Sequence, residues 1–309
     1  MRGAFFIVGP TAVGKSELAA GVARERGAEI ISADAFQIYR GLDLLTAKPD
    51  AVTLAKAPHH LFGTMSILDE MNAEKFRKLA LQAISEVHSR GRLAIVVGGS
   101  GLYIKALTHG LGCAPAADPD LRAQLGESSL EELREKLLRV DADAAGKIDM
   151  KNRRRVQRAL EICLLTGKPA SQQRTEWTAG ETVRAGLAFA TTGVFVFRDR
   201  EDLYQRINRR VERMFEAGVI EEVRAAGATS DTASKMIGLR EIRHLLDGKM
   251  SMLQCAAAIQ QATRRYAKRQ LTWFRRQTSF QPLNLSLLSH NEARISLLAK
   301  ISGVLAGND

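Results

Sequence analysis

A glycine-rich loop directly after a short apolar segment is the feature that most constrains this chain. The segment Ala4–Val8 is apolar throughout, as in a buried β-strand, and it runs into the loop Gly9–Ser16. The loop reads GPTAVGKS and fits the pattern G-x-x-x-x-G-K-[ST] at every position. A helical pattern begins at Ser16 and stops at Gly27. A strand, a glycine loop and a helix in this order predict an α/β protein that binds a phosphorylated ligand.

Each part of this loop supplies a different contact to a phosphate. The glycines let backbone N–H groups turn inward, and the helix N-terminus adds a partial positive charge. Lys15 supplies a full charge, and the Ser16 hydroxyl can ligate Mg²⁺. The residues that we expect to bind the phosphate are Gly9, Pro10, Thr11, Ala12, Val13, Gly14, Lys15 and Ser16. The loop alone does not distinguish a nucleotide from another diphosphate.

Apolar segments and helical patterns alternate along the first third of the chain. Glu29–Ser32 and Leu93–Val97 have the pattern of two more strands, and Ala73–Ser89 has that of an amphipathic helix. Strands that are apolar throughout are typical of a parallel sheet covered on both faces. We therefore expect an α/β fold in which a P-loop NTPase-like parallel sheet is covered by helices.

The pattern changes near Cys113 and predicts a second domain. Pro115 and Pro119 interrupt the chain, charged helical patterns follow, and Val194–Phe197 restores the strand pattern. We predict a catalytic core of residues 1–117 plus 194–309 and a mostly helical insertion domain of residues 118–193. Within the core, a long helix is expected from about Ser251 to Gln277, and residues 280–309 carry only a weak pattern.

Charge points to a polyanionic partner. The chain has 45 Lys and Arg against 34 Asp and Glu, a net charge of +11. Residues 194–309 alone carry 19 basic and 12 acidic groups. Arg264–Arg276 holds six basic residues and no acidic one, with Tyr266 and Trp273 between them. Basic groups with interleaved aromatic residues are typical of nucleic-acid surfaces, although Trp273 itself fits the core better. Lys151–Arg158 is a second basic cluster.

Cysteine usage and hydropathy indicate the cellular compartment that we expect for this protein. Cys113, Cys163 and Cys255 have no metal-binding spacing and form no disulfide framework, which favours a reducing cytoplasm. No apolar run approaches the ~20 residues of a membrane-spanning helix.

One acidic residue stands where a ligand is expected. Asp34 follows the strand Glu29–Ser32 and should lie at the carboxyl edge of the sheet, beside the phosphate loop. Leu93–Val97 is followed by glycines and Ser100, with no carboxylate. The alternative interpretation of Asp34 is a helix cap.

The ordered set of motifs resembles the tRNA dimethylallyltransferase (tRNA isopentenyl-type prenyltransferase) family over nearly the whole chain. The motifs are Gly9–Ser16, DAFQIYRG from Asp34 to Gly41, TAKP from Thr46 to Pro49, His59-His60, GGSGLY from Gly98 to Tyr103, NRRRVQRALE from Asn152 to Glu161, IGLRE from Ile237 to Glu241, YAKRQ from Tyr266 to Gln270 and TWFR from Thr272 to Arg275. The chain departs from the family pattern at Ala35, Leu45, Gly63 and Leu239.

The resemblance implies a reaction. A dimethylallyl group would pass from dimethylallyl diphosphate to N6 of the adenine immediately 3′ of the anticodon, in tRNAs that read U-initial codons. The expected partners are dimethylallyl diphosphate and the anticodon stem-loop of tRNA, with the insertion domain gripping the stem. Mg²⁺ is the expected cofactor, with Ser16 as its ligand, and the chain is expected to act as a monomer away from any membrane.

The resemblance also assigns roles to residues. Asp34 would accept the proton from N6, while Lys15, Thr11 and an arginine would stabilise the departing diphosphate. Arg206 is the predicted arginine, with Arg209 and Arg210 as alternatives. The residues predicted to contact tRNA are Asp34, Ala35, Phe36, Gln37, Ser100, Arg122, Gln157, Arg158, Ala159, Leu160, Glu161, Lys268, Arg269 and Arg275.

Two other functions are compatible with the phosphate loop. One is a small-molecule or nucleoside kinase that consumes ATP. The other is a non-catalytic RNA-binding protein, against which the Asp34 loop argues.

Overall fold

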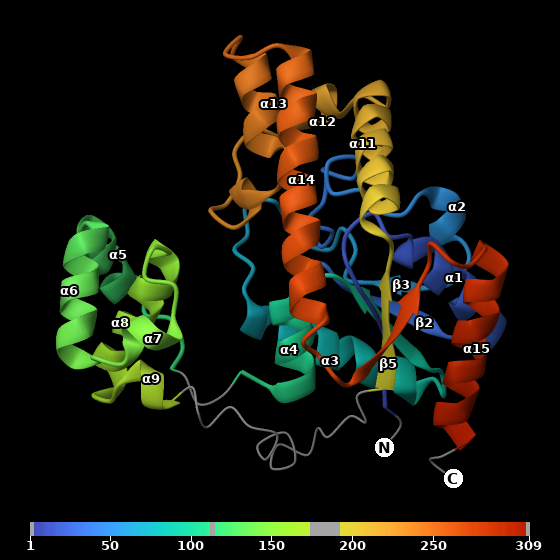
Figure 1. Ribbon diagram of the computed structural model, residues 1–309, viewed down its shortest axis with the longest axis horizontal. Coiled ribbons are helices and arrows are strands. Elements are labelled where there is room, and N and C mark those ends of the chain that lie inside the picture. Colours follow the sequence, from blue (N-terminus) through green and yellow to red (C-terminus); the bar gives the residue numbers. More distant parts are fainter. Residues whose placement is uncertain (1–2, 112–114, 174–191, 307–309) are drawn as a thin grey trace. The chain divides into compact units, whose positions relative to one another are not determined.

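The computed structural model describes residues 3–111, 115–173 and 192–306 (Figure 1). The chain divides into two compact units. The first comprises Met1–Thr108 with Phe189–Asp309, and the second comprises His109–Ala188. The predicted core and insertion, divided at residues 118 and 193, differ from these boundaries by several residues at each end. Each unit is described by itself.

The first unit is built on one parallel sheet of six strands in the order β3-β2-β4-β1-β5-β6. The strands are β1 Phe5–Val8, β2 Glu29–Ala33, β3 His59–His60, β4 Ala94–Gly98, β5 Thr192–Phe197 and β6 Phe280–Asn284. The register pairs Val8 and Ala33 with the same residue, Gly98. The carboxyl ends of three central strands therefore meet at one edge, where parallel sheets bind ligands.

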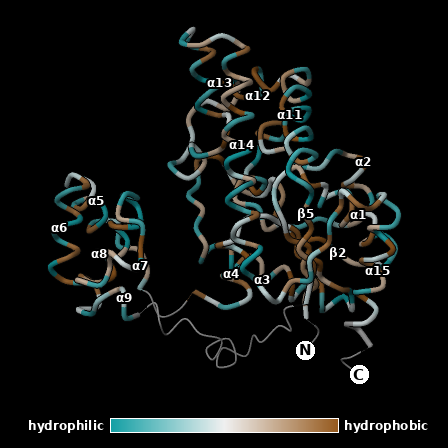
Figure 2. Tube along the Cα trace, in the orientation of Figure 1, coloured by the Kyte–Doolittle hydropathy of each residue, from teal (hydrophilic) through white to brown (hydrophobic). Residues whose placement is uncertain are grey.

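Helices cover both faces of this sheet, because successive strand residues point to opposite sides. Phe5 and Ile7 face the helices α1 (Lys15–Arg26) and α15 (His290–Ala306). Phe6 and Val8 face α3 (Ala73–Ser89), α4 (Gly101–His109) and the lower part of α14 (Met252–Phe274). Figure 2 shows the apolar strands enclosed between these helices. The predicted parallel α/β sheet covered by helices is confirmed.

A group of helices follows β5 and brings the chain back over the carboxyl edge of the sheet. They are α11 Arg200–Glu216, α12 Val219–Ala226, α13 Leu239–Leu246 and α14, with a 3₁₀ turn η1 at Ala233–Lys235. The short helix α2, Ala51–Leu54, lies in the loop between β2 and β3. α14 begins with a capping box formed by Ser251 and Gln254.

The end of the chain is more ordered than its pattern indicates. Residues 280–309 carry a weak pattern, yet they form β6 and α15. β6 is an edge strand, which tolerates Pro282 and exposed polar positions. α15 packs against α1 through Leu297 and Ile301. Tertiary contacts rather than local pattern stabilise both elements.

The second unit is helical. Its helices are α5 Pro119–Glu127, α6 Leu130–Val140, α7 Ala144–Lys147, α8 Arg153–Thr166 and α9 Ala170–Gln173. Leu133 and Leu137 of α6 pack against Val156 and Leu160 of α8 in a small core. Cys113 and residues 174–191 of the predicted insertion domain lie outside the described residues. In the described ranges, no helix is long and apolar enough to cross a membrane.

Candidate functional site: a phosphate loop beside an apolar pocket

The loop Gly9–Ser16 adopts a conformation that only glycine permits at two points. A Cβ at Gly9 would lie 2.1 Å from the carbonyl oxygen of Val196, so β5 packs directly against the loop. Gly14 has φ 102°, in the left-handed region, and caps the N-terminus of α1. Lys15 Nζ donates a hydrogen bond to the carbonyl oxygen of Pro10 at 2.7 Å. The lysine therefore lies along the loop rather than pointing into solvent.

Three arginines reach the loop from β5 and α11. Arg210 Nη1 donates to Thr11 Oγ1 at 2.8 Å, and Arg206 Nε donates to the carbonyl oxygen of Ala12 at 3.0 Å. Arg198 Nε donates to the carbonyl oxygen of Val13 at 2.9 Å. Arg206, the predicted arginine, thus contacts the loop, and both Arg206 and Arg209 are exposed. Arg210 alone of these lines the pocket described below.

Arg198 was not among the predicted residues. Its position directly after β5, at the carboxyl edge of the sheet, is the sequence signal that could have identified it.

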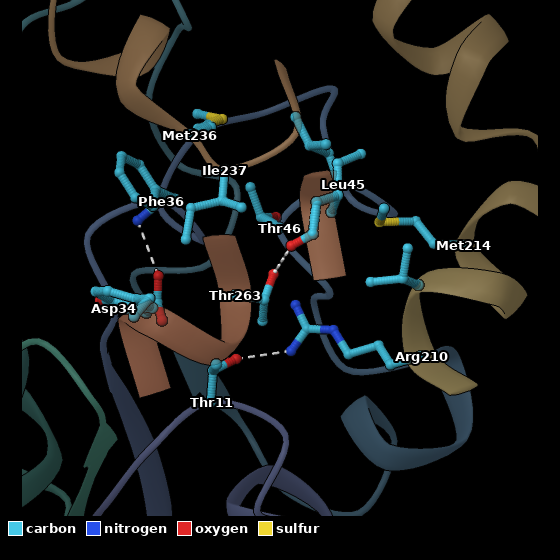
Figure 3. A pocket seen from close by; sticks show the side chains of 13 residues that line it. Thr11, Asp34, Phe36, Leu45, Thr46, Arg210, Met214, Met236, Ile237 and Thr263 are labelled. Carbon is cyan, nitrogen blue, oxygen red and sulfur yellow. Dashed lines mark hydrogen bonds between the residues drawn. The ribbon is translucent and has the colours of Figure 1, made fainter. Parts of the chain in front are cut away.

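Asp34 lies at the end of β2 and shapes the loop that follows. Its Oδ1 accepts hydrogen bonds from the backbone N–H groups of Phe36 at 2.9 Å and Gln37 at 3.4 Å. Ser100 Oγ accepts a hydrogen bond from the backbone N–H of Ala35 at 3.1 Å. Asp34 also lines the pocket, where Figure 3 shows it beside Phe36. Residues 35–38 form a turn and not a helix, so Asp34 caps a turn, and the helix-cap alternative is wrong. The same side chain is also exposed to the pocket.

Gln37 is occupied by the protein itself. Its Nε2 donates to the carbonyl oxygens of Ala47 at 3.0 Å and Thr46 at 3.4 Å, and its Oε1 accepts from Ser32 Oγ at 3.4 Å. This amide holds the loop after β2 to the strand. The predicted contact between Gln37 and tRNA stays a prediction.

Gln270 ties the phosphate loop to the neighbouring strand end, and sequence reasoning missed it. Gln270 Oε1 accepts a hydrogen bond from the backbone N–H of Thr11, and its Nε2 donates to the carbonyl oxygen of Gly99, both at 2.9 Å. Its side chain is only 5% exposed. A neutral amide at a buried helical position, among basic residues, was the available signal.

The pocket has a polar floor and an apolar wall (Figure 3). Thr11, Asp34 and Arg210 form the floor, and Tyr266 and Thr263 of α14 border it. The remaining lining residues are mostly apolar and come from four separate segments: Phe36, Leu45, Thr46, Val211, Met214, Met236, Ile237 and Ile259. Of the thirteen lining residues, Thr11, Asp34 and Phe36 are among the predicted site residues, and Arg210 is one of the two alternatives to Arg206. An anion with a short apolar tail matches this lining.

The electrostatics of the floor favour an anion. Burial lowers the pKa of Lys15 to about 8; the carboxylate of Asp34 opposes this shift, and the charge of Arg210 adds to it. Burial also lowers the pKa of Arg210, again opposed by Asp34. Burial and the charge of Asp34 raise the pKa of Tyr266 to about 12, so its hydroxyl stays protonated. A bound diphosphate would relieve the repulsion between the two cations.

A divalent cation at this loop would need ligands from the substrate. In the part of the chain that the structure describes, no group of three or more His, Cys, Asp or Glu could hold a metal ion. The oxygen donors of the loop are Ser16 and the nearby Asp34. Mg²⁺ is commonly held by one or two protein oxygens together with substrate phosphates and water, so these residues fit it.

The outer face of α14, continued into the turn that follows it, is basic and lies on the same helix as Tyr266 and Gln270. Its exposed members are Arg265, Lys268, Arg269, Arg275 and Arg276. Arg264 differs, because its Nη1 donates to Asn208 Oδ1 at 2.7 Å. Trp273 is partly buried and packs against the main core next to Gly101, as its core interpretation predicts.

In the second unit, several predicted tRNA contacts form an internal network. Glu161 is fully buried and accepts hydrogen bonds from Arg122 Nε at 3.0 Å, Arg158 Nη1 at 2.6 Å and the backbone N–H of Asp118 at 2.9 Å. The side chains of Ala159 and Leu160 are also buried. Gln157 donates to the carbonyl oxygen of Arg122 at 3.0 Å.

The side chains of Glu161, Ala159 and Leu160 therefore do not face solvent. The exposed basic residues around them are Lys151, Arg154 and Arg155. Contact between this unit and tRNA stays a prediction.

The fold and the pocket define a P-loop α/β protein with a phosphate loop, a carboxylate and an apolar wall at one site. A model of the IPP transferase family matches residues 37–277 of the chain. The tRNA dimethylallyltransferase 1 of Citrifermentans bemidjiense is 44% identical over 270 residues, which is 86% of this chain and 87% of the relative. The chain therefore belongs to the IPP transferase family.

Solved structures agree with this assignment. The tRNA isopentenylpyrophosphate transferase of Bacillus halodurans is similar to this chain with a TM-score of 0.73 and 34% identity, covering 99% of this chain and 98% of that one. A eukaryotic dimethylallyltransferase described as acting on tRNA gives a TM-score of 0.83 at 26% identity, covering 100% of this chain and 80% of that one.

Proposed function

We propose that this chain transfers a dimethylallyl group from dimethylallyl diphosphate to N6 of the adenine immediately 3′ of the anticodon, in tRNAs that read U-initial codons, and releases diphosphate. The activity is that of the family to which the chain belongs. The observation that carries the proposal is one pocket in which the phosphate loop, Asp34 and an apolar wall face the same space. A prenyl diphosphate and an amine need these three features together.

The floor of the pocket would hold the diphosphate. Backbone N–H groups of the loop, Lys15, and the pair Thr11 and Arg210 supply donors and charge. Arg206 lies close enough to join this clamp. Negative charge increases on the diphosphate as the C1–O bond breaks, so these groups stabilise the transition state more than the ground state. Mg²⁺, held by the Ser16 hydroxyl and the diphosphate, would add positive charge there.

Asp34 would act on the acceptor. N6 of adenine is a weak nucleophile because its lone pair is delocalised into the ring. As N6 bonds to C1 and the C1–O bond breaks, N6 becomes acidic and Asp34 accepts its proton. The target base would have to leave the stack of the anticodon loop to reach the pocket.

The outer face of α14 would bind the tRNA backbone. Three exposed basic residues of α14 and two in the turn after it carry this charge, and the other side of the helix lines the pocket. The second unit would add Lys151, Arg154 and Arg155 and grip the stem. We expect the chain to work as a cytoplasmic monomer on one tRNA.

Transfer of label from dimethylallyl diphosphate to unmodified bulk tRNA tests the proposal. We expect labelled tRNA, release of diphosphate, dependence on Mg²⁺ and no consumption of ATP. Consumption of ATP without prenyl transfer would identify a kinase instead. Binding of tRNA with neither reaction would leave a non-catalytic RNA-binding protein.

A further inference from the structure

We propose that Leu45 limits the length of the prenyl donor by closing the apolar end of the pocket. This inference rests on the proposed function, since it assigns the apolar wall to the alkyl group of the diphosphate. It predicts that the protein uses a five-carbon donor and excludes a ten-carbon donor by steric contact at one side chain.

The position of Leu45 supports this assignment. Leu45 lines the pocket and is 5% exposed. Figure 3 shows its side chain across the pocket from Thr11. A donor whose diphosphate lies at Thr11 and whose C1 lies near Asp34 would extend its tail toward this wall. The tail is apolar, and so are the residues that it would meet.

The wall behind Leu45 is tightly packed. A Cβ at Gly238 would lie 2.9 Å from Leu45 Cδ1 and 3.3 Å from Ile259 Cδ1. Leu45 and Ile259 therefore both rest against the start of α13 at a residue without a side chain. Leu45 cannot retreat in that direction to admit a longer donor.

The backbone that carries Leu45 is anchored from α12. Glu222 Oε1 accepts a hydrogen bond from the backbone N–H of Leu44, and Glu222 Oε2 accepts one from that of Leu45, both at 2.8 Å. Gln37 holds the next two residues through their carbonyl oxygens. A wall fixed on both sides resists displacement by a bound ligand, which is what a length limit requires. Glu222 is accordingly a positioning residue.

The size of the effect follows from carbon counts. Geranyl diphosphate carries five more carbons than dimethylallyl diphosphate. Leu45→Ala removes three carbons of the side chain, and Leu45→Gly removes four. One extra or missing methylene group in an apolar pocket changes kcat/KM by roughly 10–200-fold. We expect a change of about that size in the ratio of kcat/KM for geranyl to dimethylallyl diphosphate.

The experiment compares transfer from both donors to the same tRNA. Leu45→Ala should raise the geranyl-to-dimethylallyl ratio by about tenfold or more, and Leu45→Gly should raise it further. Leu44→Ala is the matched control, because Leu44 is the next residue, is partly buried and does not line the pocket. Its ratio should equal that of the unchanged protein. If Leu45→Ala fails to fold, Leu45→Val should shift the ratio in the same direction by less.

Glu222→Gln tests the anchoring separately. The amide keeps one acceptor and places an N–H group against a backbone N–H, so the loop should loosen. We expect the ratio to rise while transfer from dimethylallyl diphosphate continues, which a purely structural loss would not produce.

Three results would refute the inference. The first is a geranyl-to-dimethylallyl ratio that is unchanged in both Leu45 variants. The second is a ratio that Leu44→Ala raises as much as Leu45→Ala does. A third is a change only in the KM for tRNA, which would assign the wall to adenine. Absence of transfer from either donor in the unchanged protein would instead refute the proposed function, so the two failures are distinguishable.

Discussion

Replacing Asp34 by Asn separates the chemical role of this residue from its structural one. In the structure Oδ1 accepts the backbone N–H groups of Phe36 and Gln37, while Oδ2 has no hydrogen-bond partner among the described residues. The side chain in Asp34→Asn would be nearly isosteric, and its carbonyl oxygen can keep both backbone bonds. Its amide nitrogen takes the place of Oδ2, where it donates hydrogen bonds and cannot accept a proton.

The magnitude follows from these two halves of the side chain. Asn and Asp both accept the backbone hydrogen bonds of such a turn, so the free energy of unfolding should change by about a few tenths of a kcal/mol. A positioned general base contributes roughly 10²–10⁴-fold to rate. This corresponds to about 2.7–5.4 kcal/mol of transition-state stabilisation at about 1.36 kcal/mol per tenfold. The transfer step should slow by that factor, with nearly unchanged affinity for the donor.

Single-turnover prenyl transfer measured across a Mg²⁺ series is the appropriate assay. A slow step that Mg²⁺ does not restore supports the general base. Partial recovery at high Mg²⁺ would mean that Asp34 acts mainly through the metal, because mass action offsets weaker binding. A rate close to that of the unchanged protein would end the general-base assignment and leave Asp34 as a cap.

Three further predictions concern the loop and its supports. Donor affinity should fall by up to about tenfold per pH unit as pH rises through about 8, because Lys15 loses its proton there. The variant Lys15→Ala should bind the donor weakly, and its donor affinity, measured across the same pH series, should not show this dependence. Gln270→Leu leaves the N–H of Thr11 and the carbonyl of Gly99 unpaired, which should lower the free energy of unfolding by about 1–3 kcal/mol and raise the KM for the donor. An unchanged denaturation midpoint would contradict this prediction. tRNA affinity should fall roughly 10²–10³-fold between low and moderate salt, and Arg269→Gln should reduce the slope of log affinity against log salt concentration by about one. Equal affinity at both salt concentrations would exclude the outer face of α14 as the tRNA-binding surface.

The lowered pKa of Lys15 also makes the stability of the folded chain depend on pH. Its pKa is lowered from 10.5 to about 8 in the folded chain, so between these values the unfolded chain binds more protons. Stability from this residue therefore increases as pH rises through that window and is lowest below about 8. A protonated Lys15 destabilises the donor-free protein and stabilises the complex with a diphosphate.

Sequence predicts those parts of the fold that depend on local pattern. The strands β1, β2 and β4 are apolar throughout, and α3 has a regular amphipathic period, so each was located to within a residue or two. β3 is only His59–His60, too short for any period to show. β6 and α15 depend on the elements that they pack against, which no local pattern contains.

The residues of the site likewise divide into those that the sequence could locate and those that only packing brings together. The phosphate loop and Asp34 are contiguous with strands, so their place at the sheet edge follows from topology. Arg206 and Arg210 are four residues apart on one face of α11, and the helix period alone cannot tell which reaches into the pocket. Packing places Arg210 there. The apolar wall is assembled from separate segments, so only the three-dimensional structure shows that Leu45 and Met236 line one pocket.

Helix α14 connects the two substrates that the family resemblance implies. Its inner side carries Thr263, Tyr266 and Gln270, which border the pocket or tie the phosphate loop to Gly99. Its outer side carries Lys268 and Arg269, which are exposed and basic. Both sides belong to one continuous helix, so tRNA bound on the outer face, as proposed above, would be linked to the loop through the two hydrogen bonds of Gln270. Any coupling through this helix must be reciprocal: if tRNA strengthens donor binding by some factor, the donor strengthens tRNA binding by the same factor. Gln270 is where that coupling would be lost first, because it is the side chain that joins α14 to the loop and to β4 at once.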